Sequence, residues 1–568
     1  MKEFKGRVAL ITGGANGFGK AFAIEAAKRE MKIALVDIDE DDLCGTTAVL
    51  KNLGAEVLTI PADVSLCDDV KMSVAKTMEK FGQIDVLFCN AGIAPSGDIF
   101  NLPPRDWEWT AWTNLISHGY YYREVLPIMV EQGTPCHIIA TASIAGILHG
   151  IGNNPGYSAT KHGAVGLAED IRTLCRINNY DIGISVFCPG YIQTDLHHCE
   201  RHRPARFSCP EDPYYKSQHY IDAVRRVNVN ISTGTPIDPV GAYLFKAIED
   251  KQMYILPHNK FLPYIEARHR GIEKDAALPD GGEGNSERDF KDQVALITGA
   301  ASGFGYEFAK EAASRGMKLS LVDIDGERLE KVRAEFDSAG VLCVTFHGDV
   351  SIYEDVVKSV RFTMDTYGQI DVLFNNAGVA VVGDAMHVPQ NDWEWAISVN
   401  LLGQAYYYRE VLPIMIRQGT PANIVSTSSV AGILPGFAKV PTYTASKHAA
   451  VGLGESVIAR LRDMGVTNIK VSMFCPGFIQ TDLHHSENHR PERFADPGNP
   501  YYQSEYYKAR RAGLDFLITS GTPIDPVGKR LFKAMEEGQK YILTHEKHAG
   551  QIKARHQEIE DDAKKVIC

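Results

Sequence analysis

The stretch Val8-Ala-Leu-Ile-Thr-Gly-Gly-Ala-Asn-Gly-Phe-Gly19 decides the fold, and it returns as Val294-Ala-Leu-Ile-Thr-Gly-Ala-Ala-Ser-Gly-Phe-Gly305. In each copy an apolar, β-branched run leads into glycines and then into a helical pattern. Glycines let the backbone turn sharply and approach a pyrophosphate, whose charge then lies at a helix N-terminus. One such cluster is a weak signal, because an ordinary tight turn also uses glycine. Two clusters in the same context predict two dinucleotide-binding turns.

The repeat extends far beyond this motif. The copies keep an offset of 286 residues (443 − 157) as far as Tyr157 and Tyr443, and of 287 residues (476 − 189) by Pro189 and Pro476. A length change of one residue therefore separates two copies of a complete domain. A period this long excludes a solenoid, whose units of about 20–50 residues stack because none folds alone.

We expect a first domain at residues 1–274, a linker at 275–288 and a second domain at 289–568. The chain has 568 residues, and single cores stop growing at about 250–300 residues. The linker is rich in Pro, Gly and polar residues and supplies no apolar face.

Short apolar runs alternate with helix-length amphipathic segments in each copy. This alternation is typical of parallel strands that are buried on both faces and joined by helices. It predicts an α/β fold with a doubly wound parallel sheet of Rossmann type in each domain. In the first copy we expect strands at residues 33–37, 57–61, 86–90, 136–140 and 183–188, and we expect the final strands of the two copies at 252–257 and 539–543.

The composition is that of an ordinary globular protein without a basic face. Hydrophobic residues make up 44% and charged residues 23%, and the formal net charge is −12, which argues against binding of nucleic acid or of an anionic membrane surface. The N-terminus has no apolar signal core, and no run of about 18 apolar residues occurs, so we expect a cytoplasmic protein without a membrane span. The 11 cysteines are odd in number and widely spread, which favours free buried thiols.

An aspartate ends the second predicted strand of each copy, at Asp37 and Asp323. At this distance from the glycine turn an acidic side chain bonds the adenosine ribose hydroxyls, whereas a 2′-phosphate would meet its negative charge. Neither the glycine turn nor the residue after the aspartate offers an Arg or Lys to attract that phosphate. We therefore expect NAD(H) in preference to NADP(H). The alternative interpretation is that each aspartate is only a helix N-cap.

A phenol and an ammonium stand four residues apart at Tyr157 and Lys161, and on a helix they share one face. A free tyrosine, with a pKa near ~10, transfers protons poorly at neutral pH unless positive charge stabilises its phenolate. The lysine and an oxidised nicotinamide would supply that charge. Ser143 lies at the end of a predicted strand, where a hydroxyl would orient a carbonyl. Isolated Tyr and Lys pairs are common on helix surfaces, but this group recurs in the second copy as Ser429, Tyr443 and Lys447.

With these elements in chain order, the sequence resembles the short-chain dehydrogenase/reductase family over almost all of both copies. The resemblance implies two catalytic tetrads, formed by Asn114, Ser143, Tyr157 and Lys161 and by Asn400, Ser429, Tyr443 and Lys447. It implies cofactor contacts in the first copy at Gly13, Asn16, Gly17, Phe18, Gly19, Asp37, Asp63, Val64, Asn90, Ala91, Gly92, Pro189, Gly190, Ile192 and Thr194. In the second copy it implies them at Gly299, Ser302, Gly303, Phe304, Gly305, Asp323, Asp349, Val350, Asn376, Ala377, Gly378, Pro476, Gly477, Ile479 and Thr481.

The resemblance also implies a reaction and an assembly. Hydride passes between C4 of the nicotinamide and a carbinol carbon of a small-molecule substrate, while tyrosine passes the proton. Serine holds the substrate oxygen, lysine lowers the pKa of the tyrosine and grips the nicotinamide ribose, and asparagine supports a proton-relay water. Family members commonly pair through the helices that carry these residues, so we expect the two halves to pair within the chain as a pseudo-dimer, with further homodimerisation left open.

A histidine-rich stretch follows in each copy, at residues 196–207 and 483–494. Adjacent histidines with a cysteine suggest zinc, but the second copy lacks the cysteine and neither spacing fits a familiar structural site, so we expect no metal. We expect instead a loop that covers the substrate and excludes water. The tyrosines after it either line a pocket for a bulky, flat substrate or pack under the loop, namely Tyr214, Tyr215 and Tyr220.

Together these features predict an NAD(H)-dependent oxidoreductase that interconverts a secondary alcohol and a ketone, with two potentially active sites per chain. The long tail is similar to that of bacterial family members that act on bulky aromatic or alicyclic alcohols, so a bulky, hydrophobic substrate is expected. One alternative is a hydroxysteroid-type or epimerising bifunctional dehydrogenase. Another is an NAD(H)-binding scaffold or sensor in which one or both copies are non-catalytic, although a pure binder needs neither the tyrosine nor the lysine.

Overall fold

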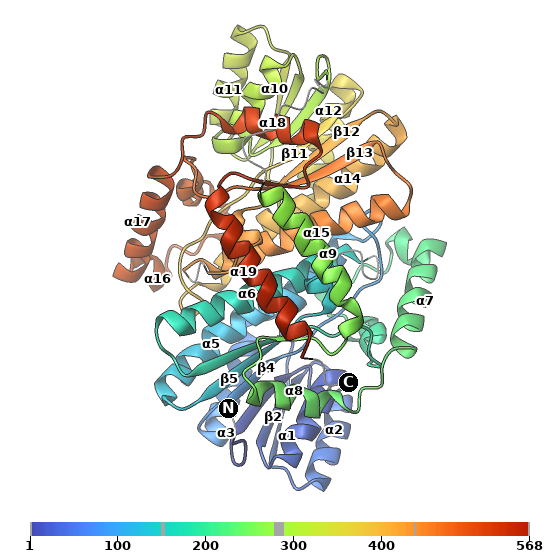
Figure 1. The fold of residues 1–568 in the computed structure, drawn as a ribbon, viewed down its shortest axis with the longest axis vertical. Coiled ribbons are helices and arrows are strands. Elements are labelled where there is room, and N and C mark those ends of the chain that lie inside the picture. Colours follow the sequence, from blue (N-terminus) through green and yellow to red (C-terminus); the bar gives the residue numbers. More distant parts are fainter. Residues whose placement is uncertain (1–2, 149–153, 278–288, 437–438, 566–568) are drawn as a thin grey trace.

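The computed structural model describes residues 3–148, 154–277, 289–436 and 439–565. It contains two seven-stranded parallel sheets, one from each half of the chain (Figure 1). The strand orders are β3-β2-β1-β4-β5-β6-β7 and β10-β9-β8-β11-β12-β13-β14, so the predicted doubly wound fold is confirmed in both halves. The first sheet consists of β1 (Val8–Thr12), β2 (Lys32–Asp37), β3 (Val57–Pro61), β4 (Val86–Cys89), β5 (Cys136–Thr141), β6 (Ile182–Phe187) and β7 (Tyr254–Ile255). The second consists of β8 (Val294–Thr298), β9 (Lys318–Asp323), β10 (Cys343–His347), β11 (Val372–Asn375), β12 (Ala422–Thr427), β13 (Ile469–Cys475) and β14 (Tyr541–Leu543).

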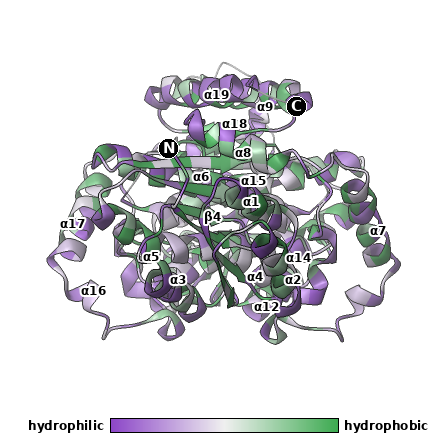
Figure 2. Cartoon of the chain, turned by 90° about the horizontal axis from the view of Figure 1, so that it is seen from below, coloured by the Kyte–Doolittle hydropathy of each residue, from purple (hydrophilic) through white to green (hydrophobic). Residues whose placement is uncertain are grey.

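Helices cover both faces of each sheet, which is why strands such as β1 are buried at every residue and have no polar face. The central strands accordingly carry the hydrophobic colour in Figure 2. In the first half one face holds α1 (Gly17–Lys28), α2 (Glu40–Asn52) and α8 (Val240–Glu249), and the other holds α3 (Cys67–Phe81), α5 (Ser117–Gln132) and α6 (Pro155–Ile177). Their counterparts in the second half are α10 (Gly303–Ser314), α11 (Gly326–Ser338) and α18 (Val527–Glu537), and α12 (Tyr353–Tyr367), α14 (Gln404–Gln418) and α15 (Pro441–Asp463).

The predicted strands are confirmed to within two residues at their ends. Because β4 ends at Cys89, Asn90 lies just beyond its carboxyl end, beside the glycine turn that follows β1. The strand order reverses between β1 and β4, and a crevice opens at such a point because the segments that leave the two strands run in opposite directions. The predicted cofactor motifs therefore emerge together at one edge of each sheet.

The two halves meet along α6 and α15, whose close approach depends on glycine. A Cβ atom on Gly163 would lie 3.0 Å from the carbonyl oxygen of Ala445, and one on Gly166 would lie 2.4 Å from the ring of His448. A side chain at either position would push the helices apart. The hydrophobic core around α3, α5 and α6 consequently continues into the core around α12, α14 and α15.

The last helix of each half crosses to the other half. Helix α9 (Leu262–Ala276) packs on β14 and α19 (Ala549–Ala563) packs on β7, and the two lie side by side across the middle of the molecule (Figure 1). Asp275 of α9 accepts two backbone N–H groups at the start of β14, and Asp562 of α19 does the same at β7. Asp275 and Ala276, which the sequence assigns to the linker, therefore end a helix, while residues 278–288 of that linker lie outside the described residues.

Two buried ion pairs connect the crossed helices to α6 and α15. The Nε of Arg268 donates to both carboxylate oxygens of Glu455 at 3.0 Å, and the Nε of Arg555 donates to both of Glu169 at 3.1 Å. Both carboxylates are almost completely buried. Each is thus held by a planar guanidinium from the opposite half, in the bidentate geometry that stabilises such pairs best.

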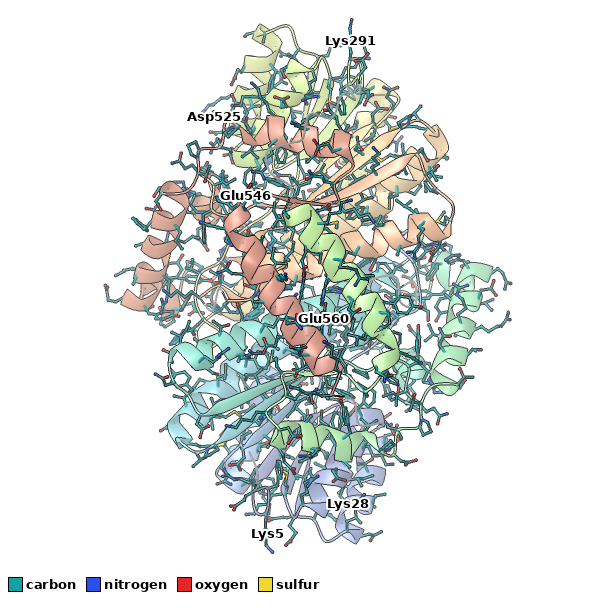
Figure 3. The ribbon with its side chains drawn as sticks, in the orientation of Figure 1. Lys5, Lys28, Lys291, Asp525, Glu546 and Glu560 are labelled. Atoms are coloured by element: carbon teal, nitrogen blue, oxygen red, sulfur yellow. The ribbon has the colours of Figure 1, made fainter. Side chains whose placement is uncertain are left out.

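A stacked pair of histidines lies where α9 and α19 touch. The rings of His269 and His556 are parallel, with their centres 3.8 Å apart. The Nδ1 of His269 lies 2.7 Å from Glu560, which is labelled between the two helices in Figure 3, and the Nδ1 of His556 lies 2.8 Å from Glu273. Each helix therefore supplies one ring and one carboxylate to the contact.

None of the described helices is long and apolar enough to cross a membrane. The ten cysteines in the described part of the chain are all unpaired, and eight of them are buried, as the sequence predicts.

Removing one partner of a buried ion pair should destabilise the protein strongly. Arg555→Met leaves the Glu169 carboxylate in the interior without its cation, and this loss is worth about 3–5 kcal/mol. Urea denaturation at pH 7 should show the free energy of unfolding falling by that amount. The control is Lys246→Ala, which removes a pair with Asp250 on the exposed surface and should leave the unfolding curve unchanged. Equal effects of the two substitutions would contradict the expected role of the buried pair.

Candidate active site

The glycine turn of each half links a strand to the helix whose N-terminus faces the crevice. Gly13 and Gly17 have left-handed backbone angles, with φ of +63° and +50°. A Cβ atom on Gly19 would lie 1.9 Å from the carbonyl oxygen of Gly13, so no side chain fits there. The turn thus presents bare backbone at the start of α1, the arrangement that binds a pyrophosphate. Gly299, Gly303 and Gly305 repeat it in the second half.

Thr12 and Asn90 fix this turn to the neighbouring strand. The Thr12 hydroxyl accepts the backbone N–H groups of Asn90 at 2.8 Å and of Ala91 at 3.0 Å, and the Asn90 amide donates to the Thr12 carbonyl at 3.0 Å. Thr298 and Asn376 make the same contacts. The threonine belongs to the quoted motif, but nothing in the local sequence pattern predicts this bridging role.

Asp37 lies at the carboxyl end of β2 and supports the glycine turn directly. Its carboxylate accepts the backbone N–H groups of Ala15 at 3.0 Å and of Asp39 at 3.1 Å. Burial raises the pKa of Asp37, and these hydrogen bonds oppose the rise; the same holds for Asp323. The N-cap of α2 is Asp39, so the interpretation of Asp37 as a simple helix cap is wrong.

Ser143, Tyr157 and Lys161 come together at the end of β5 and the start of α6. The Ser143 side chain lies close enough to the Tyr157 phenol to lower its pKa, against the rise that burial causes, and the Lys161 ammonium lies 5.6 Å from the centre of the tyrosine ring. The ammonium donates to the carbonyl oxygen of Thr141 at 2.8 Å. Burial raises the pKa of Tyr157 to about 12 and lowers that of Lys161 to about 8. The ammonium is buried and the phenol is partly buried, which excludes the interpretation as an ordinary helix-surface contact.

The second half contains the same group of serine, tyrosine and lysine, and the pKa values shift in the same directions. Lys447 donates to the carbonyl oxygen of Thr427 at 3.1 Å, and the Ser429 side chain lies close enough to the Tyr443 phenol to lower its pKa. Burial again raises the pKa of the tyrosine to about 12 and lowers that of the lysine to about 8. The neighbouring Ser428 donates instead to the Lys447 carbonyl, so Ser429 is the serine at the phenol.

Asn114 lies in a π-helical turn, Trp112–Ile116, between α4 (Pro104–Ala111) and α5. Its amide exchanges two hydrogen bonds with the backbone of Ile93, at 2.8 and 2.9 Å. A Cβ atom on Gly92 would lie 3.3 Å from the Lys161 nitrogen and 3.4 Å from the Asn114 oxygen, so both side chains reach the same spot. π-Helical turns are frequent at functional sites. Asn400 occupies the matching turn, Ser398–Gly403.

Most of the predicted cofactor residues line one cleft in each half. The first cleft is lined by Gly13, Asn16, Gly17, Phe18, Asp37, Asp63, Val64, Asn90, Ala91, Gly92, Thr194, Tyr157 and Lys161. The second is lined by Gly299, Ser302, Gly303, Phe304, Asp323, Asp349, Val350, Asn376, Ala377, Gly378, Pro476, Thr481, Tyr443 and Lys447. Bare glycines, a partly buried carboxylate and a buried ammonium in this order fit a nicotinamide dinucleotide.

The remaining predicted residues lie behind the clefts. Ser143 lies near the phenol of Tyr157, and Asn114 lies near the ammonium of Lys161, so both are close to residues that line the cleft. The Gly190 N–H donates to His258 at 3.2 Å, and Ile192 is buried. These residues, which do not line the clefts, are Gly19, Asn114, Ser143, Pro189, Gly190 and Ile192 in the first half and Gly305, Asn400, Ser429, Gly477 and Ile479 in the second.

The histidine-rich segment lines part of each cleft, through Leu196, Cys199 and His202 in the first half and Leu483, Ser486 and His489 in the second. Its arginines hold it to carboxylates at the cleft, because Arg206 donates to Asp63 at 2.7 Å and Arg493 donates to Asp349 at 2.6 Å. That this segment covers the substrate stays a prediction.

The tyrosines after this segment pack on one another. The ring centres of Tyr214, Tyr215 and Tyr220 lie 5.3 to 5.8 Å apart. The Tyr215 hydroxyl donates to Asp106 at 2.6 Å, and none of the three rings lines the first cleft. Of the two interpretations left open by the sequence, packing under the loop is the one that these contacts support.

Two groups of histidine and aspartate in the described residues have ligand atoms within 4.8 Å of one another, Asp39 with Asp42 and His202, and His484 with His485 and Asp515. Neither group is repeated in the other half, where Arg328 replaces Asp42 and Asn228 replaces Asp515. They give no support to a metal shared by the two copies.

Comparison with known proteins agrees with this geometry. The sequence profile of the family described as short chain dehydrogenase matches residues 7–205 and again residues 293–492. A relative named CLA biosynthesis dehydrogenase/reductase, from Lactiplantibacillus plantarum, is 46% identical over 280 residues, which are 49% of this chain and 97% of the relative. Levodione reductase from Leifsonia aquatica is 39% identical over 197 residues, or 34% of this chain and 72% of the relative.

One solved structure spans both halves. The C-domain of a bacterial malonyl-CoA reductase, solved with NADP, matches 96% of this chain and 100% of its own with a TM-score of 0.63. At 14% sequence identity this likeness shows the fold alone. Because the family profile covers the greater part of both halves, this chain belongs to the short chain dehydrogenase family and carries the family's domain twice.

Proposed function

We propose that the chain is an NAD(H)-dependent alcohol dehydrogenase or ketone reductase with an active site in each half. The observation that carries the proposal is the buried group of Ser143, Tyr157 and Lys161 beside a dinucleotide turn, repeated in the second half. A protein that only bound the cofactor would need no tyrosine phenol beside that ammonium, because the phenol serves proton transfer. Catalysis is therefore favoured over a scaffold or sensor function.

The proposed cofactor is NAD(H), held in the first half by three features of the cleft. Backbone N–H groups at the start of α1 would bind the pyrophosphate, Asp37 the adenosine ribose hydroxyls and Lys161 the nicotinamide ribose. The Asp37 carboxylate would repel a 2′-phosphate, which supports NAD(H) over NADP(H). When bound, the nicotinamide supplies a hydride acceptor or donor at C4.

The side chains of the first site would transfer the proton, orient the substrate oxygen and hold the lysine in place. Tyr157, with its pKa raised to about 12, is a poor base by itself, and the Lys161 ammonium would stabilise its phenolate. Ser143 would orient the substrate oxygen toward the phenol, since its side chain lies close enough to that phenol to lower its pKa. Asn114, held by the backbone of Ile93, would keep the lysine and a relay water in place.

A bulky, hydrophobic secondary alcohol or ketone is the proposed substrate. Trp109 lines the first cleft and Trp395 the second, so an aromatic wall stands in each. Two relatives are named as a reductase and a dehydrogenase/reductase, which supports carbonyl and alcohol chemistry. The clefts differ at Cys199 and Ser486, and this difference keeps the alternative of a hydroxysteroid-type or epimerising pair of sites.

We further propose that residues 1–274 and 289–568 act as an intramolecular pseudo-dimer in the cytoplasm. The α6–α15 contact and the crossed terminal helices support the pairing. A linked partner has a high effective concentration, which favours pairing within the chain. The unpaired cysteines support a reducing compartment.

Removing the phenol of one half should inactivate the site in that half and leave the other site active. Tyr157→Phe should lower turnover at the first site at least about 100-fold, because only the proton-transferring hydroxyl is removed, and Tyr443→Phe should do the same at the second site. The measurement is NADH absorbance with a panel of ketones, and NADH fluorescence checks that binding survives. If one variant loses all activity and the other none, two working sites are excluded.

Each buried lysine should be needed for turnover at its site and should lower the free energy of unfolding of the protein. Burial lowers the Lys161 pKa from 10.5 to about 8, so below pH 8 the folded protein holds a costly charge, worth about 3 kcal/mol at about 1.4 kcal/mol per pKa unit. Lys161→Met should therefore lose turnover at its site but unfold at higher denaturant concentration at pH 7. This gain should shrink as the pH rises from 8 toward 10.5, where the unfolded lysine also loses its proton. A gain that grew with pH would contradict the assignment.

The strand-end aspartates should select the cofactor. The double variant Asp37→Ala/Asp323→Ala loses charge-assisted bonds to the ribose and should bind NADH about tenfold more weakly or worse, while NADPH binding is unchanged or tighter. Fluorescence titration with both nucleotides measures this. The control is Asp41→Ala, an exposed carboxylate of α2 that should change neither affinity. An unchanged ratio of the two affinities in the double variant would refute the NAD(H) preference.

A further inference from the structure

Residues 194–206 of the first half form a strap along the first cleft. The strap begins beside the glycine turn after β1, because a Cβ atom on Gly17 would lie 3.5 Å from the Cβ of Thr194. It ends beyond β3, where Arg206 donates to Asp63 at 2.7 Å. Between these points several of its residues line the cleft, namely Thr194, Asp195, Leu196, Cys199, His202 and Pro204.

Charged side chains tie the strap to one side of the cleft. Arg201 donates to Asp42 of α2 at 2.8 Å, and the Nδ1 of His202 lies 3.3 Å from Asp39, the N-cap of the same helix. Together with the bond to Asp63, these contacts join the strap to acidic side chains beyond β2 and β3. The ties lie at the end of the cleft that we propose for the adenosine.

A buried arginine ties the strap to the other side of the cleft. Arg203 donates to Asp106 of α4 at 2.5 Å, and its guanidinium carbon lies 4.3 Å from the centre of the Trp109 ring. Helix α4 belongs to the segment that follows β4, whereas the other ties lie beyond β2 and β3. Because the crevice opens between β1 and β4, the strap is fastened on both of its sides.

The strap of the second half, residues 481–493, is fastened in the same two directions. Arg493 donates to Asp349 at 2.6 Å, beyond β10. Arg490 lies 2.6 Å from Asp392 of α13 (Gln390–Ile397), the helix that corresponds to α4. Both halves therefore hold the strap across the crevice with an arginine on each side.

One tie is made in both halves with its charges exchanged. In the first half the strap supplies Arg201 and α2 supplies Asp42, whereas in the second half α11 supplies Arg328 and the strap supplies Asp482. Position 488, which corresponds to Arg201, is an asparagine, Asn488. The two halves thus share the attachment of the strap to this helix and not the residues that make it.

We propose that the strap closes over a bound nicotinamide dinucleotide and limits its release from each half. A dinucleotide that reaches from Asp37 to Lys161 would lie under residues tied to both sides of the crevice, so it would leave only after the ties of one side break. Asp37 takes part in none of these ties and keeps its carboxylate for the ribose. Such opening affects the release rate above all. The proposal rests on the NAD(H) binding proposed above.

The test measures NADH release, which needs no turnover. NADH-loaded protein is mixed rapidly with excess NAD+, and the fall of NADH fluorescence gives the release rate. Arg206→Ala/Arg493→Ala removes one tie in each half, and both arginines are exposed, so the variant should fold. It should release NADH at least about threefold faster, since an exposed ion pair is weak, and should bind NADH no more slowly. The control is Arg225→Ala, which removes an exposed arginine of α7 (Gln218–Ser232) and should change neither rate.

The exchanged tie allows a rescue experiment in the second half. Arg328→Asp places a carboxylate opposite Asp482 and should speed the release of NADH from that half at least about threefold. Adding Asn488→Arg installs the charge arrangement of the first half, so the double variant should release NADH at the wild-type rate. Rescue by an arginine on the strap would show that the attachment matters, and not a contact between Arg328 and the nucleotide.

Unchanged release in Arg206→Ala/Arg493→Ala or in Arg328→Asp would overturn the proposal. Slower association with unchanged release would also overturn it, because the arginines would then only attract the negative nucleotide. Failure of Asn488→Arg to restore release would count against the strap in the same way. If release depends on the ties while no ketone is reduced, the proposed catalytic function fails and the strap stands. If ketones are reduced and release ignores the ties, the strap fails and the catalytic function stands.

Discussion

The burial of helix α6 on all its sides is the constraint on which the rest of the molecule depends. One face carries Tyr157 and Lys161 toward the cofactor cleft, and another packs against α15 of the second half. An ammonium inside the protein needs an acceptor, and the Thr141 carbonyl at the end of β5 supplies it. The same helix therefore positions the chemistry and joins the two halves, so the tyrosine and lysine cannot shift without disturbing that contact.

The crossed terminal helices make each half incomplete without the other. Asp275 and Asp562 satisfy backbone N–H groups at the edge strand of the opposite sheet. Separated halves would leave those donors unpaired, together with the Glu169 and Glu455 carboxylates that the opposite arginines neutralise. Fusion in one chain guarantees that both halves are present in equal amounts. Each half needs the other, because its edge strand is hydrogen-bonded by the last helix of the opposite half.

The two clefts are alike at the cofactor end and unlike around the substrate. Glycine turns, strand-end aspartates and the serine, tyrosine and lysine groups repeat with nearly the same distances. Under the proposed function, one dinucleotide and one hydride geometry explain that sameness, because both demand the same backbone and the same proton donor. Residues outside this group have no such constraint, and Asn154 against Val440 or Arg460 against Leu174 shows how far they have diverged.

Local patterns in the sequence determined the strands, the glycine turns and the pairs of tyrosine and lysine in both halves, because strand length, glycine spacing and a helical i, i+4 pair are encoded within a few neighbouring residues. Local patterns misplaced the end of α9 and did not predict what holds the histidine-rich segment in place, since both depend on partners far along the chain. Arg206 and Asp63 are 143 residues apart, and Arg460 and Asp98 are 362 apart. Only the tertiary structure decided these contacts, because an ion pair between distant residues forms where the fold brings its charges together, and no spacing in the sequence records that position.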